Sequence, residues 1–142
     1  LALGSDGAAS NNRLDIWGEM RLSALLHKGV SGDPTTVTAA QVLRMATVEG
    51  ARALGFDDVG LLREGWQADL MLVDLDLPHY VGWTPENLLM YLVYAGSSAD
   101  VVGTMVQGRW LYRRKEFATL DALRIRRESS RCHQELLNGR EH

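Results

Sequence analysis

The sequence has very little cysteine and no long hydrophobic run. Cys132 is the one cysteine among 142 residues, so an internal disulfide bond cannot form. No apolar stretch approaches the roughly 18 to 20 residues that a membrane-spanning helix needs, and no basic start followed by an apolar segment marks a secretory signal. These absences predict a cytoplasmic protein with no membrane partner. The composition, 46% hydrophobic and 23% charged, is that of a globular domain with a buried core.

Several catalytic signatures are also missing. No two of the four histidines are spaced as H-x-H, H-x-x-x-H or H-E-x-x-H, the pairs that bind a metal from one strand or helix. The P-C-x-x-C motif that one class of zinc deaminase requires beside its H-x-E is absent, as are G-x-S-x-G and the Walker phosphate loop. His27 is expected to be structural, at the end of a helix. His79, which follows Pro78 in an expected loop, is an outside candidate for a pocket.

Basic residues are scarce in most of the chain and concentrated at its end. Residues 1–108 hold 6 basic and 13 acidic side chains, a net charge of −7, whereas residues 109–142 hold 9 basic and 5 acidic, a net charge of +4. A basic C-terminal helix could contact nucleic acid, but its arginines are interleaved with glutamates and lack aromatic partners. This pattern favours a solvated or subunit-facing surface, and we expect no nucleic-acid partner.

The stretch from Leu1 to Asn12 is the part of the chain best suited to chemistry. Its first three residues are apolar or small and suit a buried strand, and Gly4 and Gly7 flank Asp6 so that the backbone can turn sharply. A carboxylate at the C-terminal end of a strand stands where α/β proteins collect ligands. The alternative is a plain turn whose polar side chains bond their own backbone.

Helical signals follow this loop. Asn11 or Asn12 is expected to cap a helix from about Leu14 to Lys28. Thr38 and Gln41 form a capping-box pattern, which predicts a helix from Ala39 to Ala53 with a left-handed residue at Gly55. Further helices are expected over residues 86–94 and from Asp121 to Gly139.

The strand signals lie between these helices. The apolar run Leu70–Val73 is bounded by two aspartates and predicts a short strand buried on both faces. Residues 101–106 and 109–112 flank Gln107-Gly108, a two-residue connection typical of a β-hairpin.

Taken in order, these segments resemble one known family. Leu3–Asn12 and Leu14–Lys28 resemble the end of the catalytic barrel in the metal-dependent amidohydrolase superfamily, and within it the 5-methylthioadenosine/S-adenosylhomocysteine deaminases. Arg44–Gly55, Gly60–Leu70 and Val106–Arg109 resemble three further signatures of that family, in the same order. The resemblance covers nearly the whole chain.

The resemblance implies a role for Asp6. Residues 1–5 would be the eighth strand of the barrel and Asp6 the carboxylate at its tip, which binds one divalent metal, usually zinc. In the family this residue also takes a proton from the metal-bound water as hydroxide attacks the purine C6. The family's metal histidines and general-acid Glu belong to earlier parts of the barrel, which this sequence does not contain. One carboxylate cannot hold a zinc ion that takes about four ligands.

The sequence therefore predicts an α/β fold: a C-terminal fragment of a TIM (β/α)8 barrel, part of a small composite β-sandwich and a C-terminal helix. The expected divisions are residues 1–55, 56–117 and 118–142. The expected function is part of a zinc-dependent deaminase of a purine nucleoside thioether, with Asp6 as catalytic residue and metal ligand, substrate-binding residues unknown, and the isolated chain inactive.

Three alternatives stay open at this point. Within the superfamily they are an s-triazine chlorohydrolase and a guanine or 8-oxoguanine deaminase, because the residues that select the substrate lie on loops outside this sequence. Outside it, the chain could be a non-catalytic α/β interaction module that works through the basic C-terminal helix. We expect a small purine-type substrate and a homo-oligomer.

Overall fold

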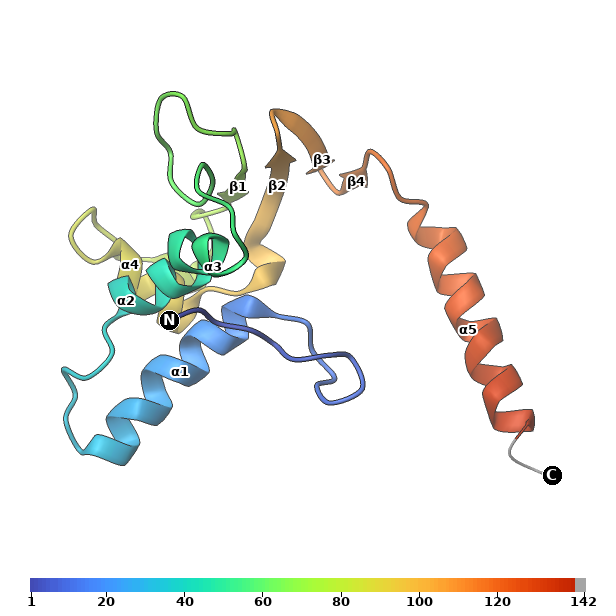
Figure 1. Cartoon of the computed structure of the whole chain (residues 1–142), viewed down its shortest axis with the longest axis horizontal. Coiled ribbons are helices and arrows are strands. Elements are labelled where there is room, and N and C mark those ends of the chain that lie inside the picture. The colour runs from blue at the N-terminus through green and yellow to red at the C-terminus, as the bar shows by residue number, and fades with distance from the viewer. Residues whose placement is uncertain (140–142) are drawn as a thin grey trace.

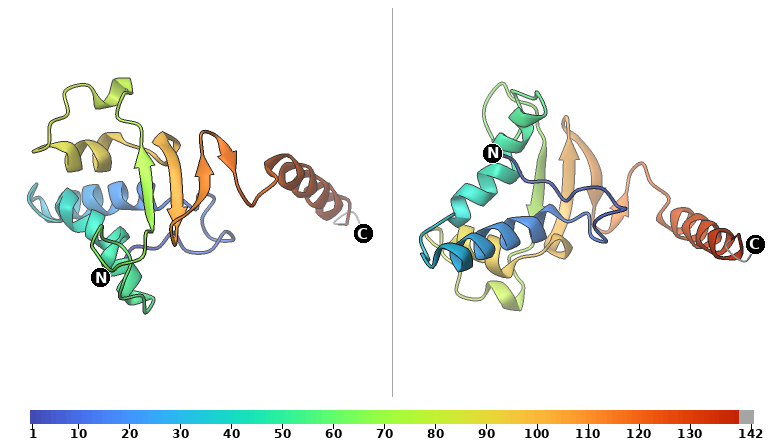
Figure 2. Two further views of the ribbon diagram at one scale, coloured as in Figure 1. Left: turned by 90° about the horizontal axis from the view of Figure 1, so that it is seen from above. Right: turned by 60° about the horizontal axis from the view of Figure 1, so that its bottom comes forward.

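A computed structural model describes residues 1–139. Helices α1 to α4 gather beside a four-stranded antiparallel sheet, and the chain leaves the sheet through β4 to a last helix, α5, that stands apart from the rest (Figures 1 and 2). The sheet order is β1-β2-β3-β4. Within residues 1–139 no helix is both long and apolar enough to span a bilayer.

The first residues do not form the predicted strand. Residues 1–5 carry no strand hydrogen bonds, and Leu1 is 98% exposed. Leu3 alone of this segment packs against the core, and its N–H lies 3.4 Å from the Met45 carbonyl oxygen. A strand forms only against a neighbour that satisfies its backbone groups, and the described residues offer none here.

Helix α1 spans Ile16–Ser31 and begins later than predicted. Its N-cap is Asp15, whose side chain accepts from the Trp17 N–H at 3.1 Å, so the expectation of an asparagine cap was wrong. Gly32, in the left-handed conformation, ends the helix.

The second predicted helix is broken in two. The Thr38–Gln41 capping box is confirmed, as is the left-handed Gly55, but α2 spans Ala39–Ala46 and α3 spans Val48–Ala53. Thr47 lies between them with φ −119° and ψ −103°, outside the helical region, and its hydroxyl donates to the Leu43 carbonyl at 2.7 Å. This side-chain bond to the preceding turn competes with the helical ladder at the break.

A glycine packs directly against this break. A Cβ at Gly60, whose φ is +93°, would lie 2.7 Å from Val48 Cα and 2.8 Å from Val48 N. The neighbouring atoms are backbone and cannot move aside. We expect Gly60→Ala to destabilise the chain by roughly 2 kcal/mol or more, through both the left-handed backbone and the clash.

Gly29 provides the matched control for this prediction. It lies inside α1 with no atom within 4 Å of the position of its added Cβ. Gly29→Ala should stabilise the chain by about 0.5–1 kcal/mol, because alanine costs less backbone entropy in a helix. Urea unfolding followed by tryptophan fluorescence measures both effects, and equal stabilities for the two variants would contradict the close approach at Gly60.

The predicted strands are present at the predicted positions, but the predicted burial of Leu70–Val73 on both faces is wrong. Strands β1 (Leu70–Val73), β2 (Val101–Val106), β3 (Arg109–Arg113) and β4 (Glu116–Phe117) pair in sequence order. The β2–β3 hairpin is confirmed, with Gln107 and Gly108 both at positive φ, as a primed two-residue turn requires. β1 is not buried on both faces: Met71 and Leu72 are each 44% exposed, because β1 is an edge strand that the helices cover only in part.

Short helical turns connect β1 to β2. They are η1 (Pro78–Tyr80), α4 (Leu88–Met90), η2 (Tyr91–Ala95) and η3 (Ser98–Asp100). The helix predicted over residues 86–94 is thus present as α4 continued by the π-helical turn η2. Trp17 Nε1 of α1 donates to the Leu92 carbonyl at 2.5 Å, which fastens α1 to this connection.

The core lies between α1, α2 and η2. Its buried members are Trp17, Met20, Ala24, Ala39, Val42 and Val93. Helix α5 (Ala122–Asn138) takes no part in it. As predicted, Asp121 caps α5, accepting from the Arg124 N–H at 2.9 Å, and the helix ends at Gly139.

Candidate metal site

Asp6 lies in an exposed turn with a strained backbone. Its φ is +59°, in the left-handed region, where aspartate and asparagine are tolerated better than most residues. Asp6 Oδ1 accepts from the Gly7 N–H at 2.7 Å, and the Gly7 carbonyl accepts in turn from the N–H groups of Ser10 and Asn11 at 2.9 and 3.0 Å. The backbone thus holds the carboxylate at the surface with one oxygen engaged.

Asn11 ties this turn to the first helix. Its Nδ2 donates to the Ser5 carbonyl at 2.8 Å and to Glu19 Oε1 at 3.1 Å, while its Oδ1 accepts from the Arg13 N–H at 2.9 Å. The sequence had suggested a helix cap for Asn11, so this link between the residue preceding Asp6 and α1 was missed. The one sequence signal for this link is an asparagine that follows the Gly-Ser-Asp-Gly turn by a few residues.

The side chains near Asp6 can be compared with the ligands that a zinc ion takes. A carboxylate oxygen is a normal zinc ligand, and Asp6 is accessible, so the residue type fits. The number does not: within residues 1–139 there is no group of three or more His, Cys, Asp or Glu side chains that could hold a metal. One carboxylate is a single ligand of the about four that zinc takes, so residues 1–139 do not make a zinc site by themselves.

The histidines do not gather at Asp6. His27 is exposed on α1 and His133 is exposed on α5, whereas His142 lies outside the described residues. His79, the outside candidate for a pocket, belongs to the turn η1 rather than a loop, and its Nε2 lies 2.9 Å from Asp100 Oδ2. This contact gives His79 a structural partner.

Asp100 is the one described buried charged residue, 5% exposed. Besides His79, it accepts from the Tyr80 hydroxyl at 2.9 Å and from the Ser97 N–H at 2.8 Å, and its Oδ1 lies 3.2 Å from the Ser97 hydroxyl. Burial by itself would raise the pKa of Asp100, but the hydrogen bonds from His79, Ser97 and Tyr80 together hold it below its ordinary value. The same burial, with the Asp100 charge nearby, raises the pKa of Tyr80. These hydrogen bonds connect η1 to η3.

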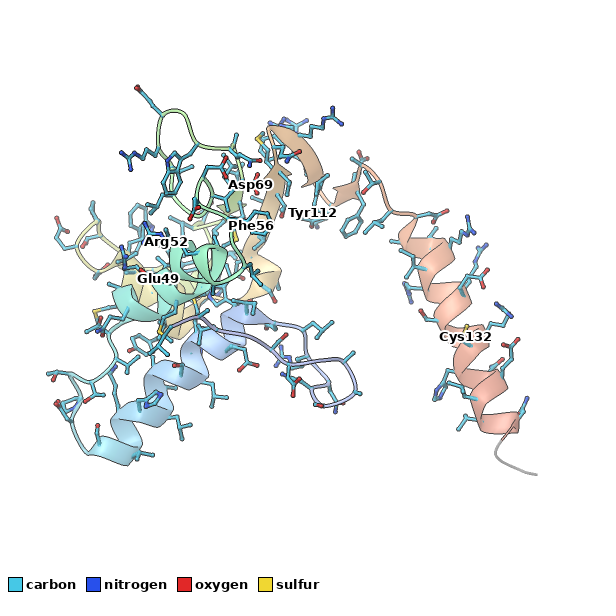
Figure 3. The ribbon with its side chains drawn as sticks, viewed as in Figure 1. Glu49, Arg52, Phe56, Asp69, Tyr112 and Cys132 are labelled. Atoms are coloured by element: carbon cyan, nitrogen blue, oxygen red, sulfur yellow. The ribbon has the colours of Figure 1, made fainter. Side chains whose placement is uncertain are left out.

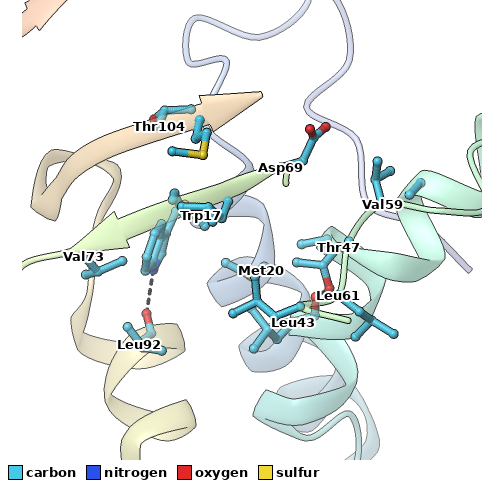
Figure 4. Close-up of a pocket in the computed structure, with 17 residues that line it drawn as sticks. Trp17, Met20, Leu43, Thr47, Val59, Leu61, Asp69, Val73, Leu92 and Thr104 are labelled. Atoms are coloured by element: carbon cyan, nitrogen blue, oxygen red, sulfur yellow. Dashed lines mark hydrogen bonds between the residues drawn. The ribbon is translucent and has the colours of Figure 1, made fainter. Parts of the chain in front are cut away.

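A cavity beside the helices lacks the chemistry of a metal site. It has a volume of about 660 Å³ and lies between α1, α2, the segment 59–62 and the sheet (Figure 4). Trp17, Met20, Leu43 and Leu92 contribute to its mostly apolar wall. Its one carboxylate, Asp69, already accepts from the Gln107 N–H at 2.7 Å. No histidine or cysteine lines the cavity, so its walls do not offer a set of metal ligands.

Comparison with known proteins confirms the predicted family. Residues 1–111 match the amidohydrolase family. The 5-methylthioadenosine/S-adenosylhomocysteine deaminase of Dictyoglomus thermophilum is 47% identical over 137 residues, which is 96% of this chain and 32% of that protein. The protein of the same name from Moorella thermoacetica is 49% identical over 126 residues, 88% of this chain and 29% of that protein. The chain thus spans about a third of the length of these relatives.

Solved structures give the same assignment. An adenosine deaminase from Xanthomonas campestris with bound zinc superposes on 97% of this chain and 31% of its own, with a TM-score of 0.91 and 36% identity. The zinc complex of atrazine chlorohydrolase from Arthrobacter aurescens covers 87% of this chain and 27% of its own, with a TM-score of 0.77 and 31% identity. From the family match over residues 1–111 and these similarities, the chain belongs to the amidohydrolase family.

Proposed function

We propose that this chain is the C-terminal part of a metal-dependent deaminase whose substrate is a purine nucleoside thioether of the S-adenosylhomocysteine or methylthioadenosine type. The observation that carries the proposal is the Asp6 turn. An exposed carboxylate in a strained turn, braced by Gly7 and Asn11, lies within the region that matches the family. The names of the relatives, at 47% identity over 96% of the chain, supply the substrate class.

Asp6 would act in two ways in the complete protein. It would bind the divalent metal through a carboxylate oxygen, zinc being the metal in two of the similar structures. The metal, when bound, supplies a Lewis acid that makes water a nucleophile near neutral pH. The Asp6 carboxylate would then accept a proton from the attacking water as its oxygen adds to the purine C6. The two protons of that water would end on the ring nitrogen N1 and on the amino group, which would leave as ammonia as the C6–N bond breaks.

The other residues of the turn would keep Asp6 in place. The Gly7 N–H donates to Asp6 Oδ1, which orients the carboxylate and leaves Oδ2 without a hydrogen bond from the described residues. Asn11 holds the Ser5 carbonyl against α1, so the residue before Asp6 cannot swing away from the helix. Preorganisation of this kind is what a catalytic carboxylate needs, because small displacements are costly in rate.

A second substrate class has specific support. The atrazine chlorohydrolase from Arthrobacter aurescens superposes on 87% of this chain at 31% identity. An s-triazine chlorohydrolase is therefore the alternative, with guanine or 8-oxoguanine deamination as a further member of the same chemistry. Cytoplasmic location and a homo-oligomeric state stay predictions.

Turnover by the complete protein tests the function. We expect kcat/KM for S-adenosylhomocysteine or methylthioadenosine to exceed the values for guanine and a chlorotriazine by at least about 100-fold, because sites built for one substrate leave polar groups unpaired with another. A higher value for either alternative substrate would overturn the thioether assignment. The 142-residue chain alone, which lacks most metal ligands, should show no turnover and should lose zinc on dialysis.

A further inference from the structure

The peptide plane between Ser5 and Asp6 sets the conformation of Asp6. The Ser5 carbonyl oxygen and the Asp6 nitrogen belong to this one plane, so a contact that fixes the oxygen also restrains φ of Asp6. That φ is +59°, and turning the plane over would bring it to the negative values that L-residues prefer. Asn11 Nδ2 donates to the Ser5 oxygen at 2.8 Å and opposes this rotation. The left-handed conformation of Asp6 therefore depends on how firmly the Asn11 amide is held.

Glu19 holds the Asn11 amide from helix α1. Asn11 Nδ2 carries two hydrogens, and besides the Ser5 oxygen it donates to Glu19 Oε1 at 3.1 Å. Asn11 Oδ1 accepts from the Arg13 N–H at 2.9 Å, so all three restraints require the same orientation of the planar amide. A hydrogen bond to a carboxylate is roughly twice as strong as one between neutral groups. Glu19 thus supplies the charged restraint on Asn11.

Helix α1 gives Glu19 a fixed base. Trp17 and Arg21 both donate from their side chains to backbone carbonyl oxygens in the segment 92–96. These two residues are four positions apart and share one face of the helix, whereas Glu19, two positions from each, lies on another face. The helix is thus bonded to η2 on one side and, through Glu19, to the Asp6 turn on the other.

We propose that Glu19 is a positioning residue for the reaction: through Asn11 it fixes the peptide plane before Asp6 and so the direction of the Asp6 carboxylate. This inference rests on the proposed function, because it assigns the direction of the carboxylate a role in binding the metal and taking the proton. Residues that hold a metal ligand in place are typically worth about 10- to 100-fold in metal affinity or activity.

Kinetics of the complete protein measure this contribution. Glu19→Ala should lower kcat by about 10- to 100-fold and leave KM within about twofold, because it misplaces a group that acts on water rather than one that binds the substrate. Glu19→Gln keeps an oxygen that can accept from Asn11 and should retain most of the wild-type kcat. Asn11→Asp is isosteric but sets an oxygen against the Ser5 and Glu19 oxygens, so it should lose at least as much as Glu19→Ala.

A second readout needs neither metal nor turnover. A left-handed φ brings the N–H and Cα–H hydrogens of one residue close together, so the nuclear Overhauser effect between them should be strong for Asp6 in the 142-residue chain. This signal should weaken in Glu19→Ala and in Asn11→Asp, because the Ser5–Asp6 plane is then free to turn over. It should stay strong in Glu19→Gln.

Glu49→Ala is the matched control. Glu49, like Glu19, is a half-buried carboxylate in the first turn of a helix, with Arg44 at 2.6 Å and Arg52 at 3.9 Å as its partners. Figure 3 shows Glu49 and Arg52 on α3, apart from the turn that precedes α1. Glu49→Ala should lower stability in urea to an extent similar to Glu19→Ala but leave kcat and the Asp6 signal unchanged.

Three results would overturn the inference. They are a wild-type Asp6 signal in Glu19→Ala, a wild-type kcat in Glu19→Ala when Asp6→Asn is inactive, and an equal loss of kcat in Glu19→Ala and Glu49→Ala. Failure of the proposed function is distinguishable from these. A fully active Asp6→Asn would overturn the proposed function, whereas the Asp6 signal would still report whether Glu19 fixes the turn.

Discussion

Asp6→Asn is expected to lower kcat/KM of the complete protein by at least about 1,000-fold, with little change in stability. Asparagine tolerates the left-handed backbone at φ +59° and its oxygen can still accept from the Gly7 N–H, so the turn should survive. The variant lacks the negative charge that we propose binds the metal and the basic oxygen that we propose takes the proton. Loss of a positioned general base alone costs about 100- to 10,000-fold.

This substitution separates the two interpretations of the Gly/Asp/Asn-rich turn. If Asp6 only stabilises the turn, asparagine should do so nearly as well, and activity should stay within tenfold of the wild type. Asp57→Asn is the matched control: Asp57 is an exposed aspartate in another loop, and its change should leave kcat/KM unaltered. Steady-state kinetics and zinc content of the three proteins distinguish the outcomes.

Asp100→Ala is expected to destabilise the chain by roughly 3 kcal/mol or more. The substitution leaves the fully buried Tyr80 hydroxyl and the Ser97 N–H without their acceptor, and each buried group left unsatisfied costs about 1–3 kcal/mol. The substitution also removes the hydrogen bonds that connect η1 to η3. Urea unfolding measures the loss, and Asp57→Ala at an exposed site should stay within about 0.5 kcal/mol of the wild type.

The contribution of Asp100 to the free energy of unfolding should decrease at acidic pH. Its pKa in the folded chain is below the ordinary value, so the folded state favours the charged form. The stabilisation is therefore complete above the unfolded pKa of about 3.9 and is lost as the pH falls through the folded value. The stability difference between wild type and Asp100→Asn should be constant near neutral pH and narrow below about pH 4. If this stability difference instead increased at acidic pH, Asp100 would not be a charged, hydrogen-bonded carboxylate in the folded chain.

The elements that local chemistry determines were predictable from the sequence. The Thr38–Gln41 capping box, the Gln107-Gly108 turn and the Asp121 cap each join residues within a few positions of one another, so the sequence contains the whole interaction. Asp6 was singled out for the same reason, since the glycines around it permit its turn. Its role in metal binding stays a prediction.

The predictions that were wrong concern features that depend on contacts between distant parts of the chain. Residues 1–5 have a strand's composition but no neighbouring strand among residues 1–139, and Met71 in β1 is exposed because only part of the sheet is covered. The break at Thr47 coincides with the close approach of Gly60, 13 positions later. The Asp100 cluster was missed although Ser97 and Asp100 have the spacing of a capping box.

The coordination of zinc in the complete protein tests the central claim most directly. A crystal structure with zinc bound should place an Asp6 carboxylate oxygen about 2.0–2.2 Å from the metal, with the other protein ligands outside residues 1–139. The account would be contradicted if zinc were fully ligated by other residues while the Asp6 side chain bonded only the Gly7 N–H and solvent.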